Sequence, residues 1–387
     1  MIRNISVGID IGSTTTKVVV GEFLKGEKNP KIIGVGESES KGMRHGYVVD
    51  ISEATKSLRS AISSAEKSSG IKIKRAFVAV GGATLRGDIV SGTAIISKAD
   101  GEVTNLDINK ALNECEDNLN LNNRKIIKVS PISFKLDGKE ILGRPTGMRG
   151  TKLEVKALFV TSSISHFEDL YDTVTSTGVE PIDFIASGEA GSFIAMTQKQ
   201  KIVGGALVDI GSETVSLSVF ENGILASLYT FPIGGADITN DIALGMKTSL
   251  ENAEKLKLGD SSEEFSKKKL DEIIEARLFD IFEVIENHLK KIKRNELLPA
   301  GIVFIGGSAN IPGLEEFSKS GLKLPSKIGS TEIFGNIKTK LRDPSWFTAL
   351  GLIMIPDEDG YYGEGSFKNL FKNVKTILKK NIKELMP

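Results

Sequence analysis

Cysteine is almost absent from this chain of 387 residues, which contains only Cys115. A single thiol excludes an internal disulfide, a thiolate zinc site and an iron–sulfur cluster held by this chain alone. Such cysteine usage is typical of a reducing compartment. Net charge is lacking as well, since 50 Lys and Arg balance 50 Asp and Glu. This balance excludes a wholly basic nucleic-acid-binding protein.

The sequence also has no long hydrophobic run. No stretch reaches about 18 consecutive apolar residues, so no segment is predicted to span a membrane. The N-terminus, MIRNISVGID, lacks the pattern of a signal peptide and enters a strand directly. We therefore expect a cytosolic protein. With 40% apolar residues the chain can bury a sizeable core, and its length predicts two or three domains.

What the chain does contain is an internal repeat. Residues 7–20 read VGIDIGSTTTKVVV and residues 206–219 read ALVDIGSETVSLSV. Each is a β-branched strand, an Asp-Ile-Gly-Ser turn and a second strand. A second pair follows in the same order, because AFVAVGGAT at 76–84 resembles GIVFIGGSA at 301–309. Two matches in the same order predict that the chain has two structurally related halves that face each other.

The turns of the repeat have the composition of an anion site. Gly, Ser and Thr at the tip of a strand pair offer backbone N–H groups and hydroxyls to a phosphate. No G-x-x-x-x-G-K-[ST] motif occurs, so the turn is not the kind that opens a helix. Asp10 and Asp209 end the leading strands, and Mg²⁺ is usually held by one or two carboxylates together with phosphates. The pair predicts a clamp for a magnesium nucleotide, whereas one copy alone is also compatible with an ordinary tight turn.

A further glycine pair, Gly306 and Gly307, follows a continuous apolar strand. It precedes a helix that the sequence predicts to begin at Pro312. Glycine at such a place allows a base or a ribose to approach the backbone closely. The alternative interpretation is a plain strand-to-helix loop.

These motifs resemble those of the actin-like ATPase superfamily, and within it the chain resembles the FtsA family of bacterial cell-division proteins. The closer resemblance is carried by segments outside the shared ATPase motifs and covers essentially the whole chain. They are KGMRHGYVVDISEATKSLRSAI at 41–62, GRPTGMRGTKLEV at 143–155, FPIGGADITNDIALGM at 231–246, NAEKLK at 252–257 and SWFTALGLIM at 345–354.

The resemblance implies an α/β fold with two lobes, of the actin-like ATPase type. It also implies an inserted small α/β subdomain in the first lobe and a C-terminal amphipathic helix. The implied divisions are 1–83 for the first lobe core (completed by 163–190 and 340–355), 84–162 for the insert, 191–227 and 301–339 for the second lobe core, 228–300 for its helical subdomain, 356–366 for a flexible linker and 367–387 for the helix.

The same resemblance implies site residues, with ATP and Mg²⁺ as cofactors. Asp10 and Asp209 would face Mg²⁺ through water, and Glu189 would orient the attacking water. The family binds ATP more reliably than it hydrolyses it, so binding is expected before turnover. The implied nucleotide contacts are Gly12, Ser13, Thr14, Thr15 and Lys17 at the β- and γ-phosphates, Gly211, Ser212 and Thr214 opposite them, Gly234 and Gly235 beside them, Glu254 and Lys257 at the ribose and adenine edge, and Gly306, Gly307 and Ser308 under the base.

Periodicity predicts structure in two further segments. Within the insert, GDIVSGTAIIS, NLDINKALNECEDNL, RKIIKVSPISFKLDG and KLEVKALFV indicate a strand, a helix and two strands, with Cys115 as a packing residue on the helix. Residues 265–293 carry apolar side chains at helical spacing. That spacing predicts a core-facing helix, and a groove for a partner is the alternative.

The C-terminal segment has the pattern of a membrane-surface helix. Residues 356–366 read as a linker, and the residues after them place apolar side chains on one face and lysines on the opposite flank. Docking back onto the body is the alternative. The predicted membrane contacts are Phe367, Leu370, Phe371, Val374, Ile377, Leu378 and Ile382, with Lys368, Lys372, Lys375 and Lys379 toward anionic lipids.

The resemblance implies an ATP-binding protein that polymerises on the cytoplasmic side of the cell membrane at the division septum. Its partners would be the C-terminal peptide of FtsZ, further copies of itself, later division proteins and anionic lipids, with no nucleic acid. Two alternatives share the fold: a pilus-assembly actin homologue that binds a peptide of a membrane partner, and a small-molecule kinase or activator ATPase. Activator ATPases hold an iron–sulfur cluster with cysteines, so a single Cys115 argues against them.

Overall fold

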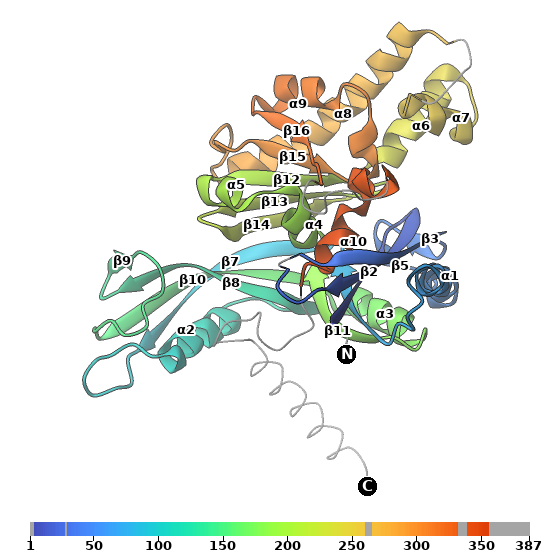
Figure 1. The fold of residues 1–387 in the computed structure, drawn as a ribbon. Coiled ribbons are helices and arrows are strands. Elements are labelled where there is room, and N and C mark those ends of the chain that lie inside the picture. The colour runs from blue at the N-terminus through green and yellow to red at the C-terminus, as the bar shows by residue number, and fades with distance from the viewer. Residues whose placement is uncertain (1–3, 28, 260–264, 332–338, 356–387) are drawn as a thin grey trace.

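A computed structural model of the chain describes residues 4–27, 29–259, 265–331 and 339–355. The predicted linker and membrane helix, residues 356–387, lie outside the described residues. The strands form two large sheets and a two-stranded ribbon, and the strands of the two repeats lie in separate lobes (Figure 1). The fold is mixed α/β and actin-like, as the sequence predicted.

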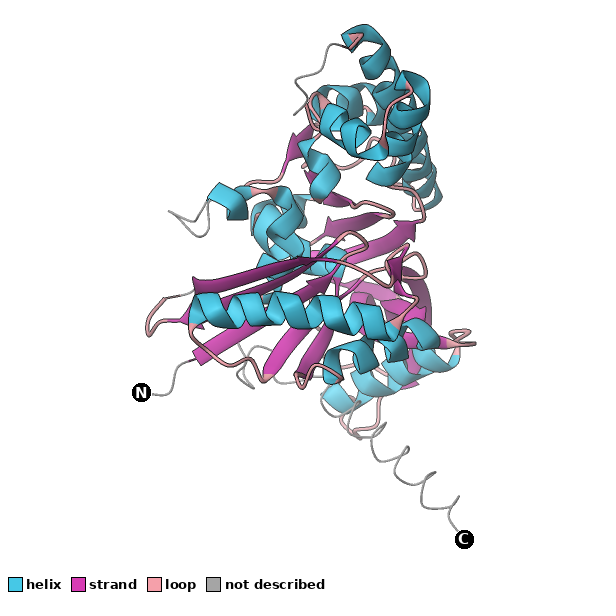
Figure 2. Cartoon of the chain, turned by 90° about the vertical axis from the view of Figure 1, so that its right-hand side faces the viewer, coloured by secondary structure: helices cyan, strands magenta, loops and turns pink. Residues whose placement is uncertain are grey.

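The first repeat forms a five-stranded sheet. In spatial order its strands are β11 (Glu180–Ala186), β6 (Arg75–Val80), β1 (Asn4–Ile11), β2 (Thr15–Phe23) and β3 (Lys31–Glu39). β1 pairs antiparallel with β2 and parallel with β6, so the repeated motif is a hairpin beside a parallel strand. Helix α1 (Ile51–Ser69) lies across the outward face of this sheet (Figure 2). It begins where the Asp50 carboxylate accepts the N–H of Glu53, a standard N-cap.

The second repeat forms the same arrangement at one end of a nine-stranded sheet. Its strands are β16 (Ser326–Ile328), β15 (Ile302–Ile305), β12 (Gly205–Ile210), β13 (Val215–Glu221) and β14 (Ile224–Phe231). β12 pairs antiparallel with β13 and parallel with β15, which reproduces the pairing of β1 with β2 and β6. The predicted internal repeat is therefore confirmed as a repeat of topology.

The inserted segment supplies the rest of the nine-stranded sheet. It contains β7 (Arg86–Ile95), helix α2 (Asn105–Asp117), β8 (Arg124–Leu136) and β10 (Lys152–Ser163), which are the three strands and the helix that the sequence predicted. A short further strand, β9 (Lys139–Ile141), was not predicted. Cys115 is fully buried on α2 in the apolar core of this segment, which confirms its packing role. β7 pairs with β14 at Arg86 and Tyr229, so the sheet of the second repeat continues into the insert (Figure 1).

Four helices pack on the second repeat, namely α6 (Gly235–Met246), α7 (Leu250–Lys257), α8 (Lys267–Lys291) and α9 (Leu314–Leu322). The prediction that α8 faces the core is confirmed, because its apolar residues at helical spacing are buried. Helix α9 begins at Leu314, so the predicted start at Pro312 is wrong. A 3-10 turn, Gly307–Asn310, follows β15, and Gly313 takes the position before the helix with a left-handed φ of 80°. Among the described residues, no helix is long and apolar enough to cross a membrane.

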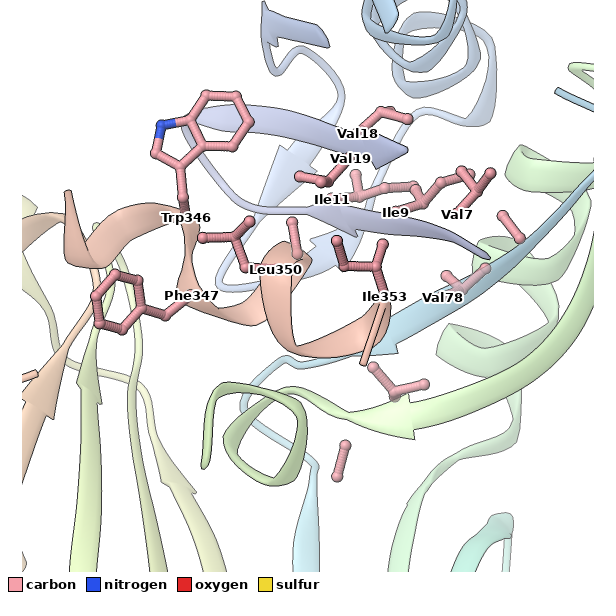
Figure 3. Packing of buried hydrophobic residues seen from close by; sticks show 14 of the residues in the cluster. Val7, Ile9, Ile11, Val18, Val19, Val78, Trp346, Phe347, Leu350 and Ile353 are labelled. Atoms are coloured by element: carbon pink, nitrogen blue, oxygen red, sulfur yellow. The ribbon is translucent and has the colours of Figure 1, made fainter. Parts of the chain in front are cut away.

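The centre of the molecule is a pair of short helices between the two sheets, α4 (Ser187–Ala195) and α10 (Phe347–Leu352) (Figure 1). Trp346, Leu350 and Ile353 are buried and pack against apolar side chains of β1 and β2 (Figure 3). The remaining elements are the ribbon of β4 (Met43–Arg44) and β5 (Tyr47–Val48), helices α3 (Ile164–Thr175) and α5 (Gln198–Val203), and the 3-10 turns Thr339–Arg342 and Pro344–Trp346.

We predict that Gly351→Ala destabilises the protein by about 1–3 kcal/mol through overpacking. A Cβ at Gly351 would lie 1.8 Å from the carbonyl oxygen of Ala190, so α10 and α4 must separate to admit it. Urea unfolding measures the effect. Gly81→Ala is the matched control, because its Cβ would meet only the Ser187 hydroxyl at 3.7 Å. Equal stability of the two variants would contradict the close packing of α4 and α10.

Candidate functional site

The two repeated hairpins turn in the same way. Gly12 donates its N–H to the carbonyl of Thr15 at 3.1 Å, and Gly211 donates to the carbonyl of Thr214 at 2.9 Å. In the part of the chain that the structure describes, the N–H groups of Ser13 and Ser212 donate to no protein acceptor. Unused N–H groups at the tip of a turn are the donors that an anion requires.

Asp10 and Asp209 end the leading strands of the two hairpins and face each other closely enough to interact. Burial raises the pKa of Asp10 to about 6, against the effect of Lys17. Burial and the charge of Asp10 raise the pKa of Asp209 to about 7. Both residues are only partly buried. The sequence prediction that these two aspartates lie opposite each other agrees with this electrostatic coupling.

A single ammonium group serves both aspartates. Lys17 is opposite Asp10 in the register of β1 and β2, and its charge lowers the pKa of Asp10 and of Asp209. Its Nζ donates to the Thr15 hydroxyl at 2.9 Å and lies 5.6 Å from the ring centroid of Trp346. One cation against two carboxylates leaves one negative charge when both are ionised. A bound cation would offset that charge.

Two loops of the second lobe meet beside the Gly211–Ser212 turn. Gly235 donates its N–H to the carbonyl of Gly211 at 2.9 Å, which places the Gly234–Gly235 loop on the hairpin. A Cβ at Gly235 would lie 2.0 Å from the hydroxyl of Ser308, so these two loops touch. A Cβ at Gly306 would lie 2.3 Å from an Asp209 carboxylate oxygen, whereas one at Gly307 would meet no atom within 4 Å. The backbone at Gly307 is therefore open to a ligand.

Lys257 and Glu254 stand at the edge of these loops. Lys257 is buried, and burial lowers the pKa of its ammonium group. Its Nζ donates to the Glu254 carboxylate at 2.7 Å, the Thr239 hydroxyl at 2.9 Å and the carbonyl of Gly235 at 3.1 Å. The Glu254 side chain is about half exposed. The lysine thus fixes the Gly234–Gly235 loop, while the glutamate is the member of the pair that remains open to solvent.

Glu189 is held in a different environment. Its carboxylate, on α4, forms an ion pair with Lys128 of the insert. A second ammonium group lies nearby on α5, where burial lowers the pKa of Lys201 to about 8 and the charge of Glu189 acts to raise it. The observed role of Glu189 is therefore to hold a cation of the insert against the central helix. Its role toward an attacking water stays a prediction.

Three residues at the site were missed by sequence reasoning. Gly46 donates its N–H to the Ser13 hydroxyl at 3.0 Å, and His45 donates its N–H to a Glu213 carboxylate oxygen at 2.5 Å. Aligning the two turns would have pointed to Glu213, because it occupies in the second turn the position that Thr14 occupies in the first.

The donor set fits a magnesium nucleotide rather than a site made of protein ligands alone. Among the described residues, no group of three or more His, Cys, Asp or Glu is placed to hold a metal ion. Mg²⁺ commonly keeps several waters and takes only one or two carboxylates plus substrate phosphates. Asp10 and Asp209 match that pattern, and the N–H groups of the turns supply donors for the phosphates.

Two family models match the sequence. The model described as "Cell division protein FtsA" matches residues 206–351, and the model described as "SHS2 domain inserted in FTSA" matches residues 82–161. The cell division protein FtsA of Bacillus subtilis (strain 168) is 32% identical over 369 residues, which cover 90% of this chain and 82% of the relative. The FtsA of Borreliella burgdorferi (strain ATCC 35210 / DSM 4680 / CIP 102532 / B31) is 26% identical over 404 residues, covering 98% and 96%.

Solved structures share the fold at low sequence identity. The structure described as "PilM-PilN type IV pilus biogenesis complex" matches with a TM-score of 0.69 at 15% identity, over 90% of this chain and 97% of that chain. The ethanolamine utilization protein EutJ from Carboxydothermus hydrogenoformans matches with a TM-score of 0.55 at 16% identity, over 92% and 90%. At this level of identity the likeness concerns the fold alone.

We predict that Asp209→Asn gains stability relative to the unaltered chain as the pH rises. Because the pKa of Asp209 is higher in the folded state than its ordinary value of 3.8, the folded protein holds a proton that the unfolded chain has lost between about pH 4 and 7. Raising the pH through this window therefore lowers the free energy of unfolding. The asparagine removes that loss. The free energy of unfolding of the variant, relative to the unaltered chain, should therefore be about 2 kcal/mol higher at pH 8 than at pH 5.

Urea unfolding without nucleotide or divalent cation at both pH values measures this difference. Comparing the variant with the unaltered chain cancels the contribution of the buried His166 and His288, whose pKa values burial lowers to about 4. Asp271→Asn, on the exposed side of α8, is the matched control and should show no change with pH. A pH-independent effect of Asp209→Asn would mean that neither burial nor the charge of Asp10 raises the pKa of Asp209 in the folded protein.

We predict that Glu189→Gln lowers the free energy of unfolding by about 1–3 kcal/mol, because Lys128 and Lys201 lose their shared carboxylate. Glu154→Gln breaks the exposed pair with Lys152 and serves as the control, with an expected effect of about 0–1 kcal/mol. Thermal unfolding of both variants makes the comparison. If Glu189→Gln were as stable as the unaltered chain, the Glu189 carboxylate would not contribute to the stability of the fold.

Proposed function

The chain belongs to the FtsA family of cell-division proteins, and from that premise we propose that it binds ATP with Mg²⁺ between its lobes and tethers FtsZ to the cell membrane. The observation that carries the nucleotide part is the meeting of two turns of the same geometry, each with an unused serine N–H group, beside a facing pair of aspartates. That arrangement answers the two needs of a magnesium nucleotide, which are hydrogen-bond donors for phosphates and carboxylates for the hydrated cation.

Each part of the site has a separate task in this proposal. The turns at Ser13 and Ser212 hold phosphate oxygens, and Lys17 adds a positive charge next to the first turn. Asp10 and Asp209 orient the hydration shell of Mg²⁺, which would neutralise phosphate charge. The open backbone at Gly307 receives the nucleoside. Glu254, the exposed partner of Lys257, is placed to accept a hydrogen bond from the ribose.

Binding, rather than rapid turnover, is the function that these contacts support. The carboxylate of Glu189, the residue that the resemblance assigns to the attacking water, is already paired with Lys128. Orienting a water would require that pair to open. We propose that the nucleotide sets the separation of the lobes and so favours filaments of this chain at the division septum.

Membrane attachment rests on the sequence of residues 367–387. Six lysines and one glutamate accompany an apolar face in this segment, and each lysine near an anionic leaflet contributes about 1 kcal/mol. One such helix holds reversibly, whereas a filament that presents many helices gains avidity from their high effective concentration. The C-terminal peptide of FtsZ would bind the second lobe, and later division proteins would join the assembly.

We predict that the full chain sediments with anionic vesicles and that a chain ending at Ser366 does not. Addition of ATP and Mg²⁺ should increase the sedimented fraction, because polymerisation multiplies the helices that contact one vesicle. Co-sedimentation with vesicles containing phosphatidylglycerol measures both effects, and neutral phosphatidylcholine vesicles are the control.

A full-length variant with glutamine at Lys368, Lys372, Lys375 and Lys379 separates charge from apolar contact. It should bind anionic vesicles weakly and lose the salt dependence of the unaltered chain. If the full chain and the shortened chain both stayed in solution, membrane tethering by this segment would be refuted. If the nucleotide left the sedimented fraction unchanged, the link between filament and membrane would be refuted.

A further inference from the structure

One acidic side chain breaks the symmetry of the two turns. The first turn reads Gly12-Ser13-Thr14-Thr15, and the second reads Gly211-Ser212-Glu213-Thr214. The turn that offers N–H groups to an anion thus carries a carboxylate in one copy only. In the part of the chain that the structure describes, no lysine or arginine forms an ion pair with Glu213. Its charge is therefore uncompensated by a neighbouring cation.

The carboxylate of Glu213 is held at the first lobe by the turn of the β4–β5 ribbon. His45 and Gly46 form this two-residue turn, with φ values of 47° and 74° that turn both N–H groups outward. The N–H of His45 meets the Glu213 carboxylate at 2.5 Å, and the imidazole Nδ1 lies 3.3 Å from the Glu213 carbonyl oxygen. A hydrogen bond to a carboxylate is stronger than one between neutral groups. Glu213 is therefore fixed in place.

The same turn reaches the phosphate donors of the first hairpin. Gly46, the neighbour of His45, donates its N–H to the Ser13 hydroxyl at 3.0 Å. The turn is anchored from behind, because Ala83 donates its N–H to the carbonyl of His45 at 3.2 Å. The charge of Glu213 is thus separated from the Ser13 hydroxyl by two adjacent N–H groups. A terminal phosphate that reached Ser13 would meet this negative charge at close range.

We propose that Glu213 is a specificity-determining residue that disfavours the terminal phosphate of a nucleoside triphosphate. The inference rests on the proposed nucleotide site. It gives a reason why the affinity for a triphosphate would exceed the affinity for a diphosphate by less than the open turns alone would allow. Two negative groups that contact adjacent N–H groups of one turn repel each other, and in a partly buried site surrounding salt screens them only in part. A diphosphate lacks the terminal phosphate and so brings less negative charge toward Glu213.

Glu213→Gln tests the proposal, because glutamine keeps an oxygen to accept the His45 N–H and removes the charge. We expect the variant to bind a non-hydrolysable ATP analogue with Mg²⁺ about tenfold more tightly than the unaltered chain, with ADP affinity changed by less than about twofold. The gain should shrink in high salt. Calorimetric titration of the full chain measures both affinities, and Glu272→Gln on exposed α8 removes the same charge as the matched control.

The outcomes separate this inference from the proposed function. If both nucleotides bind the unaltered chain and Glu213→Gln leaves their affinity ratio unchanged, Glu213 does not select. If the variant loses affinity for the triphosphate analogue, Glu213 assists the cation or a water, and the inference is overturned. If the unaltered chain binds neither nucleotide, the proposed function fails and the inference with it. Matching thermal unfolding of Glu213→Gln and the control confirms that the fold is intact.

Discussion

The meeting of two like charges is the constraint on which the rest of this structure depends. An internal repeat brings the same hairpin to the centre from both lobes, and each hairpin ends in an aspartate. Asp10 and Asp209 therefore repel each other in a partly buried space, where Lys17 supplies only one positive charge. Such a pair is stable when it binds a proton or a cation. The separation of the lobes is thus linked to whether the two aspartates bind a proton or a cation.

Helix α10 and the residues before it stabilise this centre. A Thr348 hydroxyl hydrogen-bonds the Asp209 carboxylate and lowers its pKa, while the Trp346 ring lies beside the Lys17 ammonium group. Leu350 and Ile353 of this segment pack on β1 and β2 (Figure 3). One segment near the C-terminus therefore touches the hairpin of one lobe with apolar groups and the aspartate of the other with a hydroxyl. The lack of a side chain at Gly351 lets α10 approach α4 closely at Ala190.

The sequence predicts those features that a local pattern can carry. The repeated strand–turn–strand motif gave the hairpins, and periodicity gave α8 and the elements of the insert. Contacts between distant segments leave no such pattern. Nothing near Arg86 indicates that it pairs with Tyr229, and nothing near Glu189 indicates an ion pair with Lys128. The start of α9 was misplaced because Pro312 is a common first helical residue, whereas here a 3-10 turn precedes it.

The two unforeseen contacts together define how the insert is held. Its chain ends leave the first lobe, its strand β7 joins β14 of the second lobe, and its Lys128 pairs with Glu189 on the central helix α4. The insert is thus attached to both lobes and to the element between them. A change in lobe separation cannot leave all three attachments unaltered, so it must be taken up at the β7–β14 junction or at the ion pair.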